Sequence, residues 1–69
     1  MSISHNLASV SVVSESVMKS DALATALNVM GLEQGLDYAN LNNIKALFIL
    51  VNDNKVLGYP SKEFKTLLN

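Results

Sequence analysis

The sequence predicts an α+β protein in which helices cover an antiparallel sheet, with elements in the order β-α-α-β-β-α. Three observations predict this class. Apolar and polar residues alternate over Leu7–Val13, helix-forming residues fill Val17–Met30, and an apolar run, polar only at Lys45, covers Ile44–Val51. The 69 residues contain no repeat and no low-complexity linker, so we expect a single small domain over residues 1–69.

The first strand is expected at Leu7–Val13, with the sequence LASVSVV. Its alternation places Ala8, Val10 and Val12 on one face and Ser9 and Ser11 on the other. A polar outer face is typical of an antiparallel or edge strand, because such strands bury only one side.

A helix is expected to follow from about Val17 to Met30. Ser14 and Ser16 are alternative N-caps, because a serine oxygen accepts a free N–H of the first turn. Gly31 suits the position just past the helix end, where a positive φ is common. Apolar residues cover most of the circumference, which predicts burial on more than one side.

A second, shorter helix is expected within residues 32–43, with Leu32, Leu36 and Ala39 on its inner face and Leu41 as a further candidate. Gly35 disfavours this helix, because glycine in a helix interior costs about 1 kcal/mol relative to alanine.

The run Ile44–Val51 is typical of a central strand covered on both faces. Asn and Asp residues in Asn52–Lys55 favour a tight hairpin turn, after which Lys55–Tyr59 forms the partner strand up to Pro60. A last helix over residues 62–68, capped by Ser61, would place three apolar residues on one face: Phe64, Leu67 and Leu68.

Composition argues for a protein partner and against several other functions. Hydrophobic residues make up 49% and charged residues 16%, against about 25% charged in an average domain, so some apolar surface is expected to contact another protein surface. The net charge is −1 and the lysines are spread out, which argues against nucleic-acid binding. With no cysteine, the chain has neither disulfides nor thiolate metal sites.

Targeting signals are not evident in the sequence. No apolar run reaches the roughly 18 residues of a membrane span, so none is expected. The opening MSISHNLAS has no basic segment followed by an apolar one, so no signal peptide is expected in this chain and its compartment stays open.

Asp21 and Thr25 are the candidate metal ligands. At positions i and i+4 they lie on one helix face, about 5–6 Å apart at Cβ. A carboxylate and a hydroxyl are hard oxygen donors, which Mg²⁺ prefers, typically with water and substrate phosphates completing its shell. The alternative is structural: an acid early in a helix is favoured by the helix dipole, and Thr25 merely fills a crowded face.

Other polar and aromatic residues favour structural roles. His5, the only histidine, lies near the N-terminus with no triad partner indicated. Gly31 and Gly35 form no phosphate-binding loop and are expected to serve as a helix cap and as backbone clearance. Tyr38 and Tyr59 are candidates for stacking on a flavin, but more often such tyrosines lie at a core edge. No catalytic residue is assigned.

The chain resembles the C-terminal part of the ApbE family over nearly its whole length. The resemblance is carried by HNLASVSVVSESVMKSDALATALNVMGLEQGL, then IKALFILVNDNK and SKEFKTLL, and is most specific at SVSVV, SDALATAL and MG. ApbE proteins are magnesium-dependent FAD:protein FMN transferases, formerly called thiamine biosynthesis lipoproteins.

The resemblance implies a chemistry and a site. Family members cleave the pyrophosphate of FAD, join FMN through a phosphoester bond to a Thr or Ser of a target flavoprotein, and release AMP. The family's metal-binding aspartate and threonine match Asp21 and Thr25. Members are often periplasmic or membrane-anchored.

This chain departs from the family in length. Full-length members are several times longer, and the H-I-I-D-P-x-T-G element that precedes this region is not present. We therefore expect a C-terminal fragment or truncated homologue that keeps the metal-binding helix but is inactive alone. The alternative is a non-catalytic, self-associating interaction module. A homodimer or a complementing N-terminal half is the expected partner.

Overall fold

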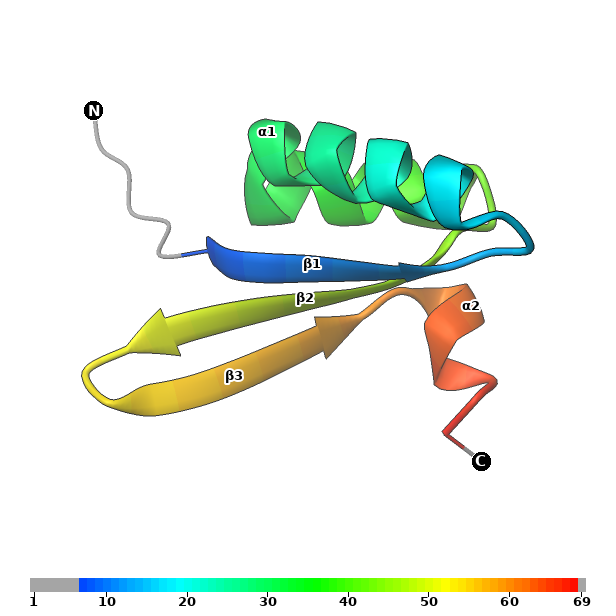
Figure 1. Cartoon of the computed structure of the whole chain (residues 1–69). Coiled ribbons are helices and arrows are strands. Elements are labelled where there is room, and N and C mark those ends of the chain that lie inside the picture. The colour runs from blue at the N-terminus through cyan, green and yellow to red at the C-terminus, as the bar shows by residue number, and fades with distance from the viewer. Residues whose placement is uncertain (1–6, 69) are drawn as a thin grey trace.

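The computed structural model describes residues 7–68. The three strands form one antiparallel sheet in the order β1-β2-β3, so β2 is central. Helix α1 lies on one face of the sheet and α2 packs near the end of β3 (Figure 1). The predicted α+β class and antiparallel sheet are confirmed. The elements are β1 (Leu7–Val13), α1 (Val17–Leu41), β2 (Lys45–Asn52), β3 (Lys55–Pro60) and α2 (Lys62–Lys65).

Helix α1 consists of two helical segments separated at Gly31. Gly31 has φ 86° and ψ 175°, a conformation that is non-helical and favours glycine. The chain reverses there, so residues 32–41 run back beside residues 17–30 on the same side of the sheet (Figure 1). The predicted helix end at Gly31 is therefore confirmed, and the two expected helices form a helical hairpin.

Gly35 lies where the two segments and the sheet approach most closely. A Cβ atom there would lie 2.8 Å from Cε2 of Phe48 and 2.9 Å from the backbone oxygen of Leu27. Both neighbours are fully buried. The expected clearance role is confirmed: the absence of a side chain lets the second segment pack against both the first segment and β2.

The hydrophobic core lies between α1 and one face of the sheet. Its fully buried members are Leu27, Ala39, Ala46 and Phe48, and Val10 of β1 packs against them. The exposed serines of β1 face away, as expected for an edge strand.

The prediction that β2 is covered on both faces is wrong. Ala46 and Phe48 are buried, whereas Leu47 and Ile49, which alternate with them, are only partly buried. The reason is that both segments of α1 cover the same face. The run Ile44–Val51, polar only at Lys45, predicted two covered faces, whereas the described residues bury side chains on one face only, at Ala46 and Phe48.

The prediction that the first helix is buried on more than one side is also wrong. Leu27 is buried, but Val17, Met18 and Val29 are 88%, 82% and 83% exposed. One side of the segment packs on the sheet, and these apolar side chains lie outside that contact. Leu41, the further inner-face candidate, is exposed as well.

The β2–β3 hairpin turns through Asp53 and Asn54, whose φ angles are 51° and 65°. This left-handed pair is the geometry of a two-residue type I′ turn and confirms the predicted turn. After Pro60, α2 ends at Lys65, earlier than the expected helix. No helix among residues 7–68 is both long and apolar enough to cross a membrane.

Candidate metal-binding site

Asp21 and Thr25 lie one turn apart in the first segment of α1, and both are exposed. The Thr25 hydroxyl donates a hydrogen bond of 3.0 Å to the backbone carbonyl of Asp21. This bond directs the hydroxyl hydrogen into the helix, so the lone pairs of Oγ1 stay available to a ligand. The segment therefore presents a carboxylate and a hydroxyl oxygen to solvent.

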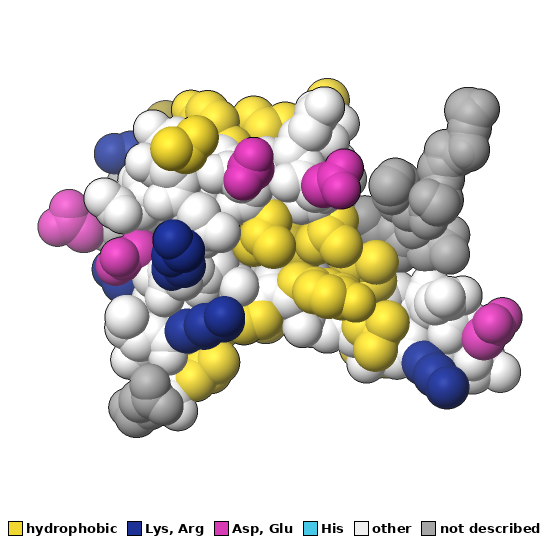
Figure 2. Space-filling model, turned by 180° about the vertical axis from the view of Figure 1, so that it is seen from behind, with side chains coloured by type: hydrophobic (Ala, Val, Ile, Leu, Met, Phe, Trp, Pro, Cys, Tyr) yellow, Lys and Arg dark blue, Asp and Glu magenta, His cyan; other side chains and the backbone are white. Residues whose placement is uncertain are grey.

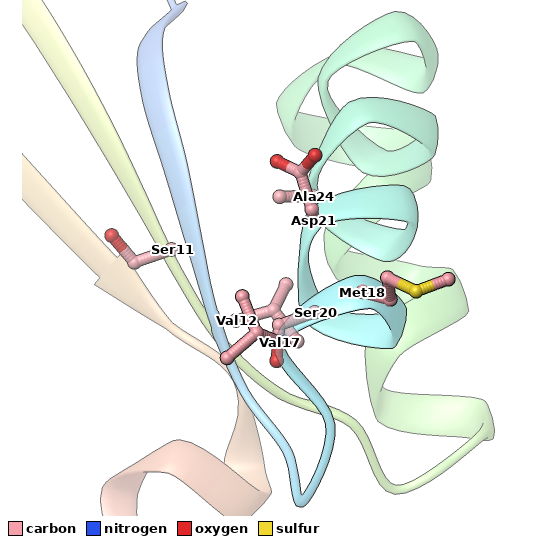
Figure 3. Close-up of a pocket in the computed structure, with 7 residues that line it drawn as sticks. All are labelled: Ser11, Val12, Val17, Met18, Ser20, Asp21 and Ala24. Carbon is pink, nitrogen blue, oxygen red and sulfur yellow. The ribbon is translucent and has the colours of Figure 1, made fainter.

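Both residues line hollows between α1 and β1, which we call the β1–α1 trough. The hollow at Asp21 has a volume of about 420 Å³ and the one at Thr25 about 370 Å³, and Ala24 lines both. In Figure 3, Asp21 lies on the side of the helix that faces β1, whereas Ser11 points away from the helix on the far side of that strand. The other residues that line the trough come from both elements and are small, apolar or amide residues: Ala8, Ser9, Val10, Ser11, Val12, Val17, Met18, Ser20, Asn28 and Val29.

Asp21 has no role in the N-terminal cap of the helix. Ser16 is the N-cap, and its hydroxyl accepts a hydrogen bond from the Lys19 N–H at 3.3 Å. Ser14, the other cap candidate, instead contacts the Ser20 hydroxyl at 2.6 Å. Asp21 thus lies beyond the first turn, where the helix dipole has largely faded, so the dipole gives little reason for an acid there.

Thr25 also lacks the packing role offered as the alternative to metal binding, because its face is exposed. Within residues 7–68 no three His, Cys, Asp or Glu side chains come together as a metal site. A cation at Asp21 would therefore take most of its oxygens from water or a bound phosphate, which is the usual arrangement for Mg²⁺.

The remaining candidates lie elsewhere. Neither Tyr38 nor Tyr59 lines the trough, and both keep a moderate exposure. Phe48 is core as expected, and Phe64 is only partly buried. His5 lies outside the described residues.

The sequence predicted only part of the role of Ser61. Its side chain caps α2, as expected, by accepting from the Phe64 N–H at 3.3 Å. It is also fully buried, donates to the Ile44 carbonyl at 2.6 Å and accepts from the Ala46 N–H at 3.0 Å. The hydroxyl therefore joins α2 to the start of β2, a contact that no local sequence pattern indicates.

Comparison with known proteins gives a consistent result. The ApbE family model matches residues 1–48. The chain is 40% identical over 67 residues to an FAD:protein FMN transferase of Vibrio cholerae, and 37% identical over 65 residues to one of Haemophilus influenzae. It covers 20% and 19% of their lengths.

Solved structures agree with the sequence matches. The flavin transferase ApbE from Vibrio cholerae superposes with a TM-score of 0.82 at 40% identity, and the apo flavinyl transferase ApbE of Pseudomonas stutzeri with 0.84 at 38%. In each case 94% of this chain is covered but only 21% of the solved chain. The chain thus corresponds to about a fifth of these proteins.

Proposed function

The chain belongs to the ApbE family, and from this membership we propose that it supplies the metal-binding part of a magnesium-dependent FAD:protein FMN transferase. FAD is the proposed substrate and a Thr or Ser of a flavoprotein the proposed acceptor. The observation that carries the proposal is the Asp21–Thr25 pair, exposed in the β1–α1 trough within the matched region.

The donor set fits Mg²⁺ in kind. Asp21 offers a negatively charged oxygen, and Thr25 offers a hydroxyl oxygen whose hydrogen is already bonded to the helix. When bound, Mg²⁺ stabilises negative charge on the pyrophosphate oxygens. The two side chains hold the cation at the trough, where the space of about 420 Å³ beside Asp21 admits water or phosphate oxygens.

The same donor set limits what this stretch of chain does by itself. An octahedral Mg²⁺ takes six ligands, and one carboxylate with one hydroxyl leaves most of them to other groups. We therefore propose that residues 1–69 alone bind Mg²⁺ weakly and do not transfer FMN, and that the active site requires further residues of an ApbE-type chain.

A second candidate function is a self-associating, non-catalytic module. The exposure of Val17, Met18 and Val29 favours it, because large apolar side chains with more than four-fifths of their surface exposed are typical of a contact face. The discriminating measurement is solution mass by sedimentation equilibrium. A monomer near 7.5 kDa argues against this module, and a dimer supports it.

The metal proposal is tested by magnesium titration of the ¹⁵N-labelled chain, with and without FAD. We expect amide shifts around Asp21 and Thr25 that saturate near millimolar Mg²⁺ and disappear in Asp21→Ala. The matched control is Asp37→Ala, which removes another exposed aspartate of α1 outside the trough. Equal shifts in both variants, or none in the unmodified chain, would refute the proposal.

A further inference from the structure

The β1–α1 trough contains a polar side chain that the metal proposal does not use. Asn28 lies in the first segment of α1, is exposed, and lines the same hollow of about 370 Å³ as Thr25. It follows Thr25 by three residues and Asp21 by seven, which is close to two full turns of a helix. The three polar side chains therefore form a row along the side of the helix that lines the trough.

The hydroxyl groups that the helix presents to the trough have already donated their hydrogens. Thr25 donates to a backbone carbonyl one turn earlier, at 3.0 Å. Ser14 donates to the Ser16 carbonyl at 2.9 Å, so the 2.6 Å contact between the Ser14 and Ser20 hydroxyls takes its hydrogen from Ser20. The amide of Asn28 differs, because its Nδ2 carries two N–H groups that can donate to a ligand.

Strand β1 adds no donor to the trough. Ser11 points away from the helix (Figure 3), and Ser9 lies on that same face of β1 because side chains alternate along a strand. Among the described residues that line the trough there is no Lys, Arg or His. An anion in the trough would therefore find its side-chain hydrogen-bond donor at Asn28.

The largest hollow is less suited to a phosphate group. It has a volume of about 560 Å³ and lies between the second segment of α1 and β3, where Glu33 and Asp37 line it together with Leu32 and Leu36. Figure 2, which views the molecule from behind, shows hydrophobic side chains gathered there with acidic side chains along one border. The carboxylates repel a phosphate, and the leucines offer it no hydrogen bond.

We infer that Asn28 is a substrate-binding residue, which donates its side-chain amide to an oxygen of the FAD diphosphate in the trough that holds Asp21 and Thr25. The inference rests on the proposed function. Diphosphate oxygens that the cation does not ligate need hydrogen-bond donors when they leave water. A hydrogen bond to an ionised acceptor is stronger than one between neutral groups, so one amide is a useful contact where no lysine is present.

The donor role separates Asn28 from the two proposed metal ligands. Asp21 and Thr25 offer oxygens to a cation, whereas a phosphate group accepts hydrogen bonds and is served by Nδ2. Asn28 should therefore matter for FAD and not for Mg²⁺ alone. A metal ligand would show the opposite pattern, because it would act through Oδ1 before any nucleotide is present.

NMR of the ¹⁵N-labelled chain tests this role by titration with Mg²⁺ alone and then with FAD at constant Mg²⁺. The Nδ2 signals of Asn28, assigned by their loss in Asn28→Leu, should move with FAD and not with Mg²⁺. Asn28→Leu should bind Mg²⁺ unchanged and FAD about tenfold more weakly, and Asn28→Gln should recover part of this loss. ADP with Mg²⁺ should move the same signals, and adenosine should not.

The matched control is Gln34→Leu, which removes an exposed amide of α1 outside the trough. It should leave the binding of both Mg²⁺ and FAD unchanged. Far-UV circular dichroism checks the fold of each variant, and leucine at position 28 favours the helix more than asparagine does.

Three results would overturn the inference. Equal FAD binding by the unmodified chain and Asn28→Leu would show that the amide makes no contact. Weaker binding of Mg²⁺ alone by Asn28→Leu would identify a metal ligand instead, and equal shifts with adenosine and ADP would identify contact with the base. Failure of the metal proposal appears separately, as missing shifts at the Asp21 amide before FAD is added; if FAD then also leaves the Asn28 signals unmoved, the inference falls too.

Discussion

Replacement of Gly35 by alanine tests the close packing of α1 against β2. The added Cβ would lie 2.8 Å from Cε2 of Phe48, 3.1 Å from its Cζ and 2.9 Å from the Leu27 carbonyl oxygen. The ring is fully buried and the carbonyl belongs to helix backbone, so neither neighbour moves aside freely.

The magnitude follows from two opposing effects. Overpacking of a core costs about 1–3 kcal/mol, and the Leu27 backbone contact places Gly35→Ala toward the upper end. Alanine recovers about 1 kcal/mol through its higher helix propensity. We expect a net loss of about 1–2 kcal/mol, a substantial share of the roughly 5 kcal/mol that stabilises a small domain.

Urea unfolding followed by circular dichroism measures this loss. With a slope of about 1 kcal/mol per molar urea, the midpoint should fall by about 1–2 M. Gly58→Ala is the matched control, because its Cβ would meet only ordinary contacts, the nearest at 3.6 Å from Leu47 Cδ1. A Gly35→Ala variant as stable as the unmodified chain would refute the packing argument.

Three further substitutions follow from the structure. Ser61→Ala leaves the Ile44 carbonyl and the Ala46 N–H without their partner, so it should lower the free energy of unfolding in urea by about 2–3 kcal/mol. The control Ser14→Ala removes an exposed hydroxyl and should change this free energy by less than about 0.5 kcal/mol. Equal effects of the two substitutions would contradict the bridging role of Ser61. Asn54→Gly should raise stability by about 0.5 kcal/mol, because glycine adopts φ 65° without strain, and a lower thermal midpoint would argue against the assigned turn. Thr25→Val should weaken Mg²⁺ binding several-fold, as measured by the magnesium-induced amide shifts at Asp21, while the far-UV circular dichroism spectrum stays unchanged. Unaltered shifts would show that Thr25 is not a ligand.

Local chemistry was sufficient to predict the elements of the fold. Alternation identified β1, the Asp53–Asn54 pair identified the hairpin turn, and Gly31 identified the end of the first helical segment. Each signal acts through the residue's own backbone preference or through its nearest neighbours. Such features do not depend on what the rest of the chain does.

Burial was predicted less well, because it depends on distant parts of the chain. Val17 and Met18 are as apolar as core residues, yet they face solvent, since both segments of α1 lie on one face of the sheet. Helix propensity alone disfavours Gly35, whereas the space it leaves for Phe48 depends on a residue distant in the sequence. Sequence composition indicated surplus apolar surface but not its location.

The sequence predicted that Asp21 and Thr25 lie together, but it did not predict the surroundings of this pair. The i, i+4 spacing brought Asp21 and Thr25 together because a helix fixes that relation. The trough beside them forms only when β1 packs against α1, and the hydrogen bond that orients the Thr25 hydroxyl is a detail of side-chain conformation.

The strand pairing also predicts an order of folding events. The β2–β3 hairpin closes through a two-residue turn, so it can form on the microsecond timescale. Pairing of β1 with β2 joins Ser9 to Ile49 and must await the reversal at Gly31, because the whole of α1 separates the two strands. We therefore expect β1 to be the latest strand to pair. The β1–α1 trough, which β1 lines, is then expected to form only with this late pairing, after the β2–β3 hairpin.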